Sequence, residues 1–449
     1  MRIGFLPIDN RPVCYTLPEM ITAIDDDIEL FLPERNLLGD LTKYADVEGI
    51  FDWLRELPEP DALVISLDTA AYGGLISSRR CPDTLEQIKE RVEKLKEILE
   101  SKNAKIYAFS SIMRISNNNI NEEEKEYWNR WGKRIFDYSY QTHKLGSESC
   151  IANIIPSDIL DDYIATRKRN FEINKLYLKW QKEGLFETLV FSKDDCAEYG
   201  FNVQEAMALE QLGGFVKTGA DEIPLTLLAR AVGCKCEKLK IVPVFSEPSQ
   251  KDLISNYEDV SLEKSVTGQI ELAGCSLSDY ENADIILYVN NFIDAQGEIV
   301  MKRPTKPFDG DWHEPEKPYM IADVRFANGA DNSFVGKLFE KGFGSDFSGY
   351  SAWNTSANSL GSLICAAKIK FIAGKYNAGA FKRLQIVRFL DDWAYQANCR
   401  QKLSAPDSGE LAKLMKPYET KISEILNTEI SAKYSFPWNR LFEVEIGLN

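Results

Sequence analysis

Residues 62–68 read ALVISLD, a run of apolar and small residues that ends in Asp68. A continuous apolar run of this length is typical of a strand that is buried on both faces of a parallel sheet. Tyr72-Gly73-Gly74 follow, and from Thr84 to Glu100 charged residues alternate with aliphatic residues at helical spacing. Strand, polar turn and helix in this order are the repeating unit of an α/β fold.

The same unit recurs along the chain. Further apolar runs lie at residues 3–8, 28–33, 105–113, 188–192, 213–220, 240–245, 284–289, 319–324 and 349–353. The helical patterns between them predict crossover connections and mainly parallel sheets. We therefore expect an α/β protein with tandem Rossmann-like domains. A β/α barrel with additions is the alternative, because ten strand–helix transitions in sequence also suit a barrel.

The chain of 449 residues is too long for one typical hydrophobic core. Strand signals are weak near residues 246–283, so we place an N-terminal α/β domain at 1–246 and a C-terminal α/β domain at 247–449. The N-terminal domain is expected to contain a long helical insertion at about 121–184.

Two further helical patterns refine this picture. Asn121 to Glu124 resemble a capping box, which predicts that a helix begins there. Another helix is expected from Leu384 to Gln401. Within it, Arg388 precedes Asp391 and Asp392 by three and four residues, which predicts an ion pair inside the helix.

Composition excludes several classes of partner. The formal net charge is −16, and nucleic-acid binding needs clustered Lys and Arg, so neither a nucleic acid nor an anionic membrane surface is an expected partner. No apolar run reaches the ~18 residues of a membrane-spanning helix. The first residues, MRIGFLPIDNRP, lack the pattern of a signal peptide, so we expect a cytoplasmic protein.

Cysteine and histidine usage points the same way. The nine cysteines are scattered without a CxxC pair, and the two histidines are His143 and His313. A zinc site of Cys and His and a Ser-His-Asp triad are therefore not expected, and reduced thiols fit a cytoplasmic protein.

Polar side chains cluster where the predicted strands end. Because the carboxyl ends of parallel strands share one edge of a sheet, these side chains are expected to line a common site. The candidates for acid–base chemistry are Asp68, Asp194, Asp195, Asp221, Glu222 and Asp323. The candidates for holding a substrate are Asp9, Arg11, Tyr72, Arg114, Asn290, Asn328, Asp331, Trp353, Asn354 and Asn358.

The adjacent carboxylates Asp194-Asp195 and Asp221-Glu222 carry the chemical argument. Like charges close together split their pKa values, so that one member keeps a proton while the other is ionised. This is what the hydrolysis of a glycosidic bond requires. The same carboxylates suit Mg²⁺ or Mn²⁺, and a helix cap beside a solvated charge is the structural alternative.

The stretch WNTSANSLG, residues 353–361, adds a binding surface to this chemistry. Trp353 offers a flat apolar face to a sugar ring. Asn354 and Asn358, one helical turn apart, offer donors and acceptors to sugar hydroxyls or to an acetamido group. The structural alternative is that Asn354 or Ser356 caps a helix and that Trp353 lies in the core.

Several short motifs taken together resemble a bacterial family known as domain of unknown function 4127. The motifs are Asp9-Asn10-Arg11-Pro12, Ser66-Leu67-Asp68 with Tyr72-Gly73-Gly74, Met113-Arg114, Asp194-Asp195, Gly219-Ala220-Asp221-Glu222, Ala322-Asp323 with Asn328-Gly329-Ala330-Asp331, and residues 353–361. The resemblance covers nearly the whole chain and implies membership of that family, but it implies no reaction.

The residues favour a hydrolase of a small polar substrate, and specifically a glycosidase that acts on a carbohydrate, including an amino sugar. The first alternative is a hydrolase that uses the same carboxylates around Mg²⁺ or Mn²⁺. The second is a protein that binds a sugar or metabolite without catalysis. No cofactor is expected for the favoured function, and a divalent metal only for the first alternative.

Overall fold

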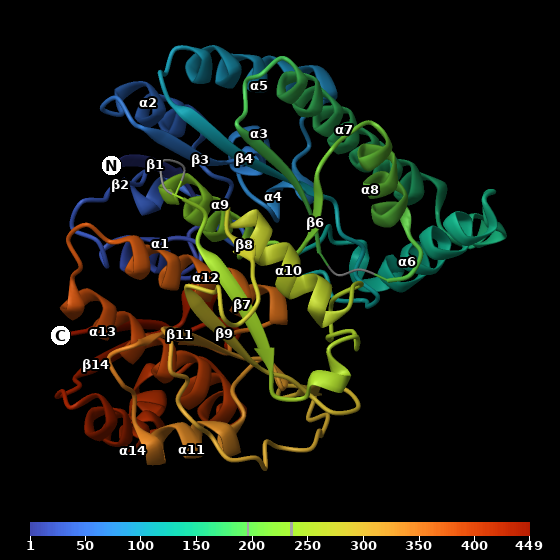
Figure 1. Ribbon diagram of the computed structural model, residues 1–449. Coiled ribbons are helices and arrows are strands. Elements are labelled where there is room, and N and C mark those ends of the chain that lie inside the picture. Colours follow the sequence, from blue (N-terminus) through green and yellow to red (C-terminus); the bar gives the residue numbers. More distant parts are fainter. Residues whose placement is uncertain (195–196, 234–236) are drawn as a thin grey trace. The chain divides into compact units, whose positions relative to one another are not determined.

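A computed structural model describes residues 1–194, 197–233 and 237–449. The chain divides into two compact units, each with its own sheet (Figure 1). Unit 1 comprises Met1–Asn10, Leu30–Pro224 and Tyr257–Asp259, and unit 2 comprises Arg11–Glu29, Leu225–Asn256 and Val260–Asn449. The division of the sequence into domains at residues 246 and 247 stays a prediction.

The unit 1 sheet has the strand order β2-β1-β3-β4-β5-β6. The pairs β1–β3, β3–β4, β4–β5 and β5–β6 run parallel. Because β1 lies between β2 and β3, the topological switch point falls at the carboxyl ends of β1 and β3. The strands are β1 (Arg2–Leu6), β2 (Glu29–Phe31), β3 (Ala62–Ser66), β4 (Lys105–Ile112), β5 (Thr188–Lys193) and β6 (Val216–Thr218).

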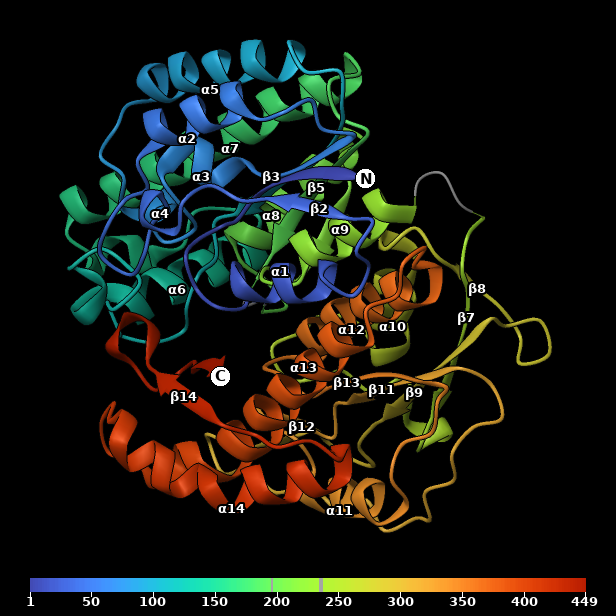
Figure 2. The ribbon, with the colours of Figure 1, turned by 90° about the vertical axis from the view of Figure 1, so that its left-hand side faces the viewer.

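Helices cover the unit 1 sheet, and α2, α5 and α7 lie side by side over one of its faces (Figures 1 and 2). The helix predicted at 84–100 is confirmed as α5, and Thr84 caps it in a capping box with Gln87. The helices of this unit are α2 (Val47–Glu56), α3 (Leu67–Tyr72), α4 (Ser77–Arg80), α5 (Leu85–Glu100), α6 (Trp128–Leu145), α7 (Ser157–Lys182) and α8 (Phe201–Gln211), with 3-10 turns η1 (Arg35–Leu37) and η2 (Cys150–Ile154).

The helix start predicted at Asn121 is wrong, because α6 begins at Trp128. Two arginines of α4 bind the side-chain and backbone oxygens of residues 121–124 that a first helical turn would use. Arg79 Nη1 donates to Glu124 Oε1 at 2.9 Å. Arg80 donates to the backbone carbonyls of Asn121 and Glu124, at 3.2 and 3.0 Å. These long-range contacts outweigh the local capping signal.

The unit 2 sheet has the strand order β13-β11-β9-β7-β8, and its pairs run parallel. Its first strand in sequence, β7, again lies between the second and the third, so the order of the first three strands matches that of unit 1. The topological switch point therefore falls at the carboxyl ends of β7 and β9. The strands are β7 (Lys240–Phe245), β8 (Ser276–Leu277), β9 (Ile285–Asn290), β11 (Tyr319–Asp323) and β13 (Phe347–Ser351). Both sheets are open, which confirms the tandem Rossmann-like fold and not the barrel.

In unit 2, α10 and α12 lie over one face of the sheet, and α11 and α14 lie on the other side (Figure 1). The helices are α1 (Thr16–Thr22), α9 (Ile223–Val232), α10 (Leu262–Leu272), α11 (Asn332–Lys341), α12 (Ser356–Ile372), α13 (Ala378–Arg388) and α14 (Ser408–Leu426), with 3-10 turns η4 (Pro248–Gln250), η6 (Arg400–Lys402) and η7 (Pro437–Asn439). Two small sheets pair β10 (Gly297–Glu298) with β12 (Phe326–Ala327) and β14 (Ala432–Ser435) with β15 (Glu445–Leu448).

Two features of unit 2 bear on later sections. Helix α1 packs against α12 and α13 and buries Leu17 and Ile21. Helix α13 continues without a break as the π-helix η5 (Phe389–Cys399), which confirms the helix predicted at 384–401. Arg388 pairs with Asp392 as predicted, with Nε 3.2 Å from Oδ2. Among the described residues, no helix is both long enough and apolar enough to cross a membrane.

Candidate functional site

Six of the predicted site residues follow five strands of unit 1 at their carboxyl ends. They are Asp9 after β1, Asp68 after β3, Arg114 after β4, Asp194 after β5 and Asp221-Glu222 after β6. Since these strands are parallel neighbours, the structure brings the residues to one edge of the sheet. Asp195 lies outside the described residues.

Asp68 occupies the first turn of α3, where the side chain of Ser66 caps the helix by accepting from Thr69 N. Its carboxyl group is buried, and the backbone N–H of Ser111 donates to its Oδ2 at 2.7 Å. Burial raises the pKa of Asp68 to about 7, although the Ser111 hydrogen bonds and the charge of Arg79 oppose the shift. Asp68 therefore changes its charge near neutral pH.

Tyr72 ends the same helix and is also buried. Its ring faces the guanidinium of Arg169, 5.2 Å from the ring centre, and burial raises its pKa. Its hydroxyl has no hydrogen-bond partner among the described residues. Gly73, with φ +86°, supplies the left-handed C-cap that turns the chain out of α3.

A chain of charges leads from the interior of unit 1 to its surface. Arg79 is buried and pairs with Glu124, while Arg114 Nη2 donates to Glu123 Oε2 at 2.7 Å. Arg114 also lies 3.5 Å from Glu124 and, through Nη1, 3.8 Å from Asp194 Oδ2. The side chain of Asp194 is 35% exposed, so this chain ends at a carboxylate that solvent reaches.

Glu222 is the second buried acid of this edge, and it is 1% exposed. The backbone N–H of Ala220 donates to its Oε2 at 3.2 Å. Burial, together with the negative charges of Asp221, Glu258 and Asp194, raises its pKa to about 8. Gly219, with φ +116°, lets the carboxylate fold back over the chain, because a Cβ built there would overlap Glu222.

The predicted residues Asn290, Asp323 and Asp331 form a closed network in unit 2. Asp323 accepts from Asn290 Nδ2 at 2.8 Å, from the Asp331 N–H at 2.8 Å and from the Tyr350 hydroxyl at 2.9 Å. Asp323 is fully buried, and burial together with Asp331 raises its pKa to about 7. These hydrogen bonds connect Asp323 to residues at the ends of neighbouring strands and at the start of α11, and its acid–base role stays a prediction.

Asp331 and Asn328 serve the backbone around this network. Asp331 caps α11 by accepting from Ser333 N at 2.9 Å, and its other oxygen accepts from Phe308 N at 2.7 Å. Asn328 adopts a left-handed conformation with φ +59° and donates to Glu298 Oε1 at 2.6 Å. Both side chains shape the turn between β11 and α11.

The N-cap residue of helix α12 is Thr355, and neither Asn354 nor Ser356 caps the helix. Thr355 Oγ1 accepts from the backbone N–H of Asn358 at 3.3 Å and from its side-chain amide at 2.9 Å. The Asn358 amide is thus turned toward its own helix start. Asn354 has φ +58° and forms the left-handed turn before the cap.

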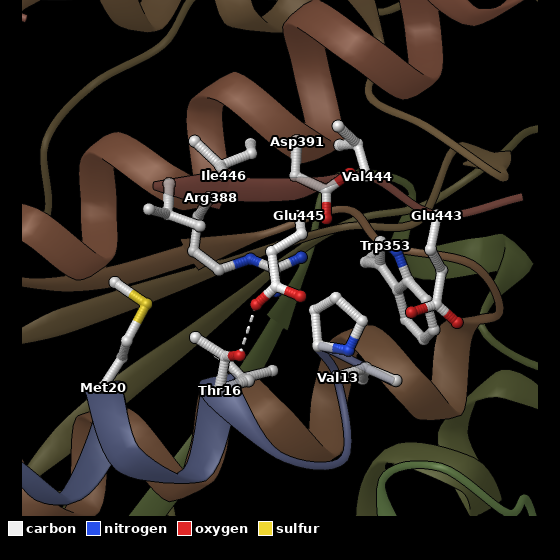
Figure 3. Close-up of a pocket in the computed structure, with 13 residues that line it drawn as sticks. Val13, Thr16, Met20, Trp353, Arg388, Asp391, Glu443, Val444, Glu445 and Ile446 are labelled. Carbon is white, nitrogen blue, oxygen red and sulfur yellow. Dashed lines mark hydrogen bonds between the residues drawn. The ribbon is translucent and has the colours of Figure 1, made fainter. Parts of the chain in front are cut away.

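Trp353 lies at a small cavity of unit 2, of which Figure 3 gives a close-up. Trp353 lines it beside Asp391, Arg388, Glu443 and residues of α1 and β15, and the free volume of the cavity is about 30 Å³. Arg11 supports the wall, because its Nη1 donates to Glu443 Oε1 at 3.0 Å.

Comparison with known protein families identifies where the chain belongs. A family model described as a protein of unknown function (DUF4127) matches residues 3–447. The chain belongs to the DUF4127 family. No curated protein and no solved structure matches it.

Within this DUF4127 chain the predicted residues fall into two sets, one in each unit. Asp9, Asp68, Tyr72, Arg114, Asp194, Asp221 and Glu222 belong to unit 1, and Arg11, Asn290, Asp323, Asn328, Asp331, Trp353, Asn354 and Asn358 belong to unit 2. Among the described residues, no three side chains of His, Cys, Asp or Glu are grouped so as to hold a metal ion.

Sequence reasoning missed several partners of these residues in the DUF4127 chain. In unit 1 these are Glu123 and Glu124, which form ion pairs with Arg114, and Arg79, which forms ion pairs with the same two glutamates. In unit 2, the buried Arg325 spans the switch point and donates to Asn290 Oδ1 at 3.1 Å and to Glu247 Oε1 at 3.1 Å. The spacing of two residues from Asp323 indicated a shared strand face, but β11 ends at Asp323 and Arg325 lies beyond it.

Proposed function

We propose that the protein hydrolyses a small glycoside at the carboxyl edge of the unit 1 sheet, with Glu222 as the acid and Asp194 as the base. The observation that carries the proposal is the burial of Glu222 among Asp221, Glu258 and Asp194, which raises its pKa to about 8. A carboxyl group in this environment keeps its proton at neutral pH, as the acid of a glycosidase must.

The proposed reaction consumes one water. Glu222 gives its proton to the glycosidic oxygen as the bond from that oxygen to the anomeric carbon breaks. Asp194 takes a proton from water as the water oxygen bonds to the anomeric carbon. Transfer of that proton through solvent then returns Glu222 to its acid form and Asp194 to its carboxylate form.

The surroundings of the two carboxyl groups fit these roles. Glu222 is shielded from solvent, which stabilises the neutral acid. Asp194 is partly exposed, where it can meet water, and Arg114 lies 3.8 Å from its Oδ2. A guanidinium at that distance favours the charged form of a carboxylate and orients it.

A screen of aryl glycosides with matched variants tests the proposal. Glu222→Gln and Asp194→Asn keep the size of each side chain, and each is expected to lower kcat/KM by about 10²-fold or more. Glu210→Gln, an exposed position of α8 in the same unit, is the control and should retain wild-type turnover. Melting temperatures check that each variant is folded.

Two outcomes would contradict the proposal. One is a wild-type protein that releases no aryl alcohol from any glycoside of the screen. The other is unaltered turnover in both amide variants. Activity that a chelator abolishes and Mg²⁺ restores would point instead to the metal-dependent alternative.

A further inference from the structure

A second cavity, of about 470 Å³, lies in unit 1 and is lined by residues at the start of α5 and along α7, two helices that pack against each other. Lys125, which precedes α6, completes the lining. This volume is enough for a small molecule. Neither Glu222 nor Asp194 lines the cavity, so it is distinct from the carboxylates of the proposed function.

The acidic groups of this lining all have basic partners within unit 1. The ion pairs, with N···O distances of 2.6 or 2.7 Å, are Asp83 with Arg91, Asp162 with Lys125, and Glu172 with Lys175. Each of these carboxylates is therefore balanced by a charge of the opposite sign. The remaining charged groups of the lining decide which ligand the cavity favours.

Those remaining groups are two bases, Lys168 and Arg169. Arg169 is only 8% exposed, and each of its hydrogen-bond acceptors is neutral. The acceptors are the backbone carbonyls of Ser78, Cys81 and Asp83 and the side-chain oxygen of Asn170, at 2.6–3.0 Å. Among the described residues, no carboxylate forms an ion pair with Arg169 or Lys168. A buried charge without a counter-charge is costly, so an anion in the cavity would be stabilised.

The start of α5 adds a favourable dipole to these two charges. The helix has 16 residues, and Thr84 caps it by accepting from Gln87 N at 3.3 Å. Leu85 lines the cavity, and its backbone N–H has no acceptor among the described residues. The first N–H groups of a helix carry partial positive charge and commonly bind anions.

We propose that this cavity binds the phosphate group of a small phosphorylated molecule. Two cationic groups without a counter-charge match a phosphate monoester, which carries about −1.5 to −2 charges at pH 7. Lys168 and the Leu85 N–H donate to the phosphate oxygens. Arg169 contributes through its charge, because its own donors are engaged. The rest of the cavity, beside Pro82 and Thr166, holds the body of the ligand.

The test follows the ³¹P signal of glycerol 3-phosphate as the full chain is added. Binding to the large protein slows the tumbling of the phosphate group and broadens its signal. We expect saturable broadening that inorganic phosphate reverses by competition. Glycerol lacks the phosphate group, and sodium acetate, at matched ionic strength, keeps only a negative charge. Each is expected to compete at least about 10-fold more weakly than inorganic phosphate.

The variants locate the binding at the cavity. Lys168→Gln is expected to weaken binding of glycerol 3-phosphate about 10-fold, whereas Lys168→Arg keeps the charge and should bind within about threefold of the wild type. Lys168 is exposed, so both variants should fold, and melting temperatures check this. Lys89→Gln is the matched control, because Lys89 is an exposed residue of α5 outside the lining and its loss changes the net charge equally.

Three results would each overturn the proposal. The first is a wild-type protein that gives no saturable broadening. The second is competition by acetate or glycerol that equals that of inorganic phosphate. The third is a Lys89→Gln variant that loses as much affinity as Lys168→Gln, which would show that only the overall charge of the protein matters.

Discussion

Glu222 and Asp68 are both acidic groups that unit 1 keeps from solvent, but their partners differ. Asp68 accepts the Ser111 N–H at 2.7 Å, which stabilises its charged form and limits its pKa to about 7. Glu222 has other carboxylates as neighbours, which add to the effect of burial and bring its pKa to about 8. The neighbours of a buried carboxyl group thus decide how far burial raises its pKa.

The raised pKa of Glu222 predicts how stability depends on pH. The ordinary pKa of a glutamate is 4.5, and that of Glu222 in the folded protein is about 8. Between these two pH values the folded protein keeps a proton on Glu222 that the unfolded chain releases. The folded state then binds more protons, so this group's contribution to the free energy of unfolding is lost as pH rises through that window. Glu222→Gln should therefore lose less stability than the wild type between pH 5 and 8.

Urea unfolding at half-unit steps of pH measures this difference. Glu210→Gln is again the control, since its exposed side chain should leave the wild-type slope unchanged. Parallel curves for Glu222→Gln and the wild type would show that Glu222 titrates normally in the folded protein.

Gly219 offers a test of what positions Glu222. Both Gly219 and Gly213 have positive φ, at +116° and +87°, so alanine is strained at either position. Only at Gly219 would the added Cβ overlap the Glu222 carboxylate, whereas nothing lies within 4 Å of it at Gly213. We expect Gly219→Ala to cost at least ~1 kcal/mol more than Gly213→Ala in urea unfolding. Equal costs would mean that the carboxylate moves aside freely.

At the scale of elements, the start of α12 is set by Thr355 through the hydrogen bonds of its hydroxyl group. Thr355→Ala should lower the free energy of unfolding by about 1 kcal/mol, because an N-terminal N–H of the helix loses its acceptor. Thr355→Ser keeps that acceptor and should stay within ~0.5 kcal/mol of the wild type. Chemical denaturation compares the three proteins, and a Ser variant as unstable as the Ala variant would argue against capping.

The strands were the most predictable elements, and the reason is local. Runs such as 62–67 are apolar because both faces of a parallel strand are covered, so the sequence itself carries the signal. Helix starts depend on partners elsewhere: the capping signal at Asn121 fails because Arg79 and Arg80 hold its groups. The Thr355 cap was missed because its neighbours Asn354 and Ser356 have at least as high a local preference for cap positions.

At the scale of the whole molecule, parallel order explains how much of the site was predictable. Residues at strand ends could be named in advance because neighbouring parallel strands share an edge. Their partners could not be named, because Arg325 and Glu247 are separated by 78 residues and Arg11 and Glu443 by 432. Such pairs follow from strand order and loop paths, which hydrophobic periodicity does not encode.

The path of the chain predicts an effect far from the substituted residue in sequence. Ile21 lies in α1 near the N-terminus, but its buried side chain belongs to unit 2. Ile21→Ala should cost about 2–5 kcal/mol through the cavity it leaves. Hydrogen exchange followed by mass spectrometry should show faster exchange in α12 and α13 and no change in β3 and β4.

Ile254→Ala is the matched control, because that side chain is 56% exposed and should change exchange little. Faster exchange in β3 and β4 with α12 and α13 unaffected would contradict the assignment of α1 to unit 2.

The early position of α1 also has a consequence for biosynthesis. Helix α1 leaves the ribosome long before α12, against which it packs and which begins only at Ser356. At roughly 5–20 residues per second, translation of the intervening chain takes on the order of half a minute. During that time Leu17 and Ile21 have no permanent partner, and a nascent-chain chaperone would find there an early segment to shield.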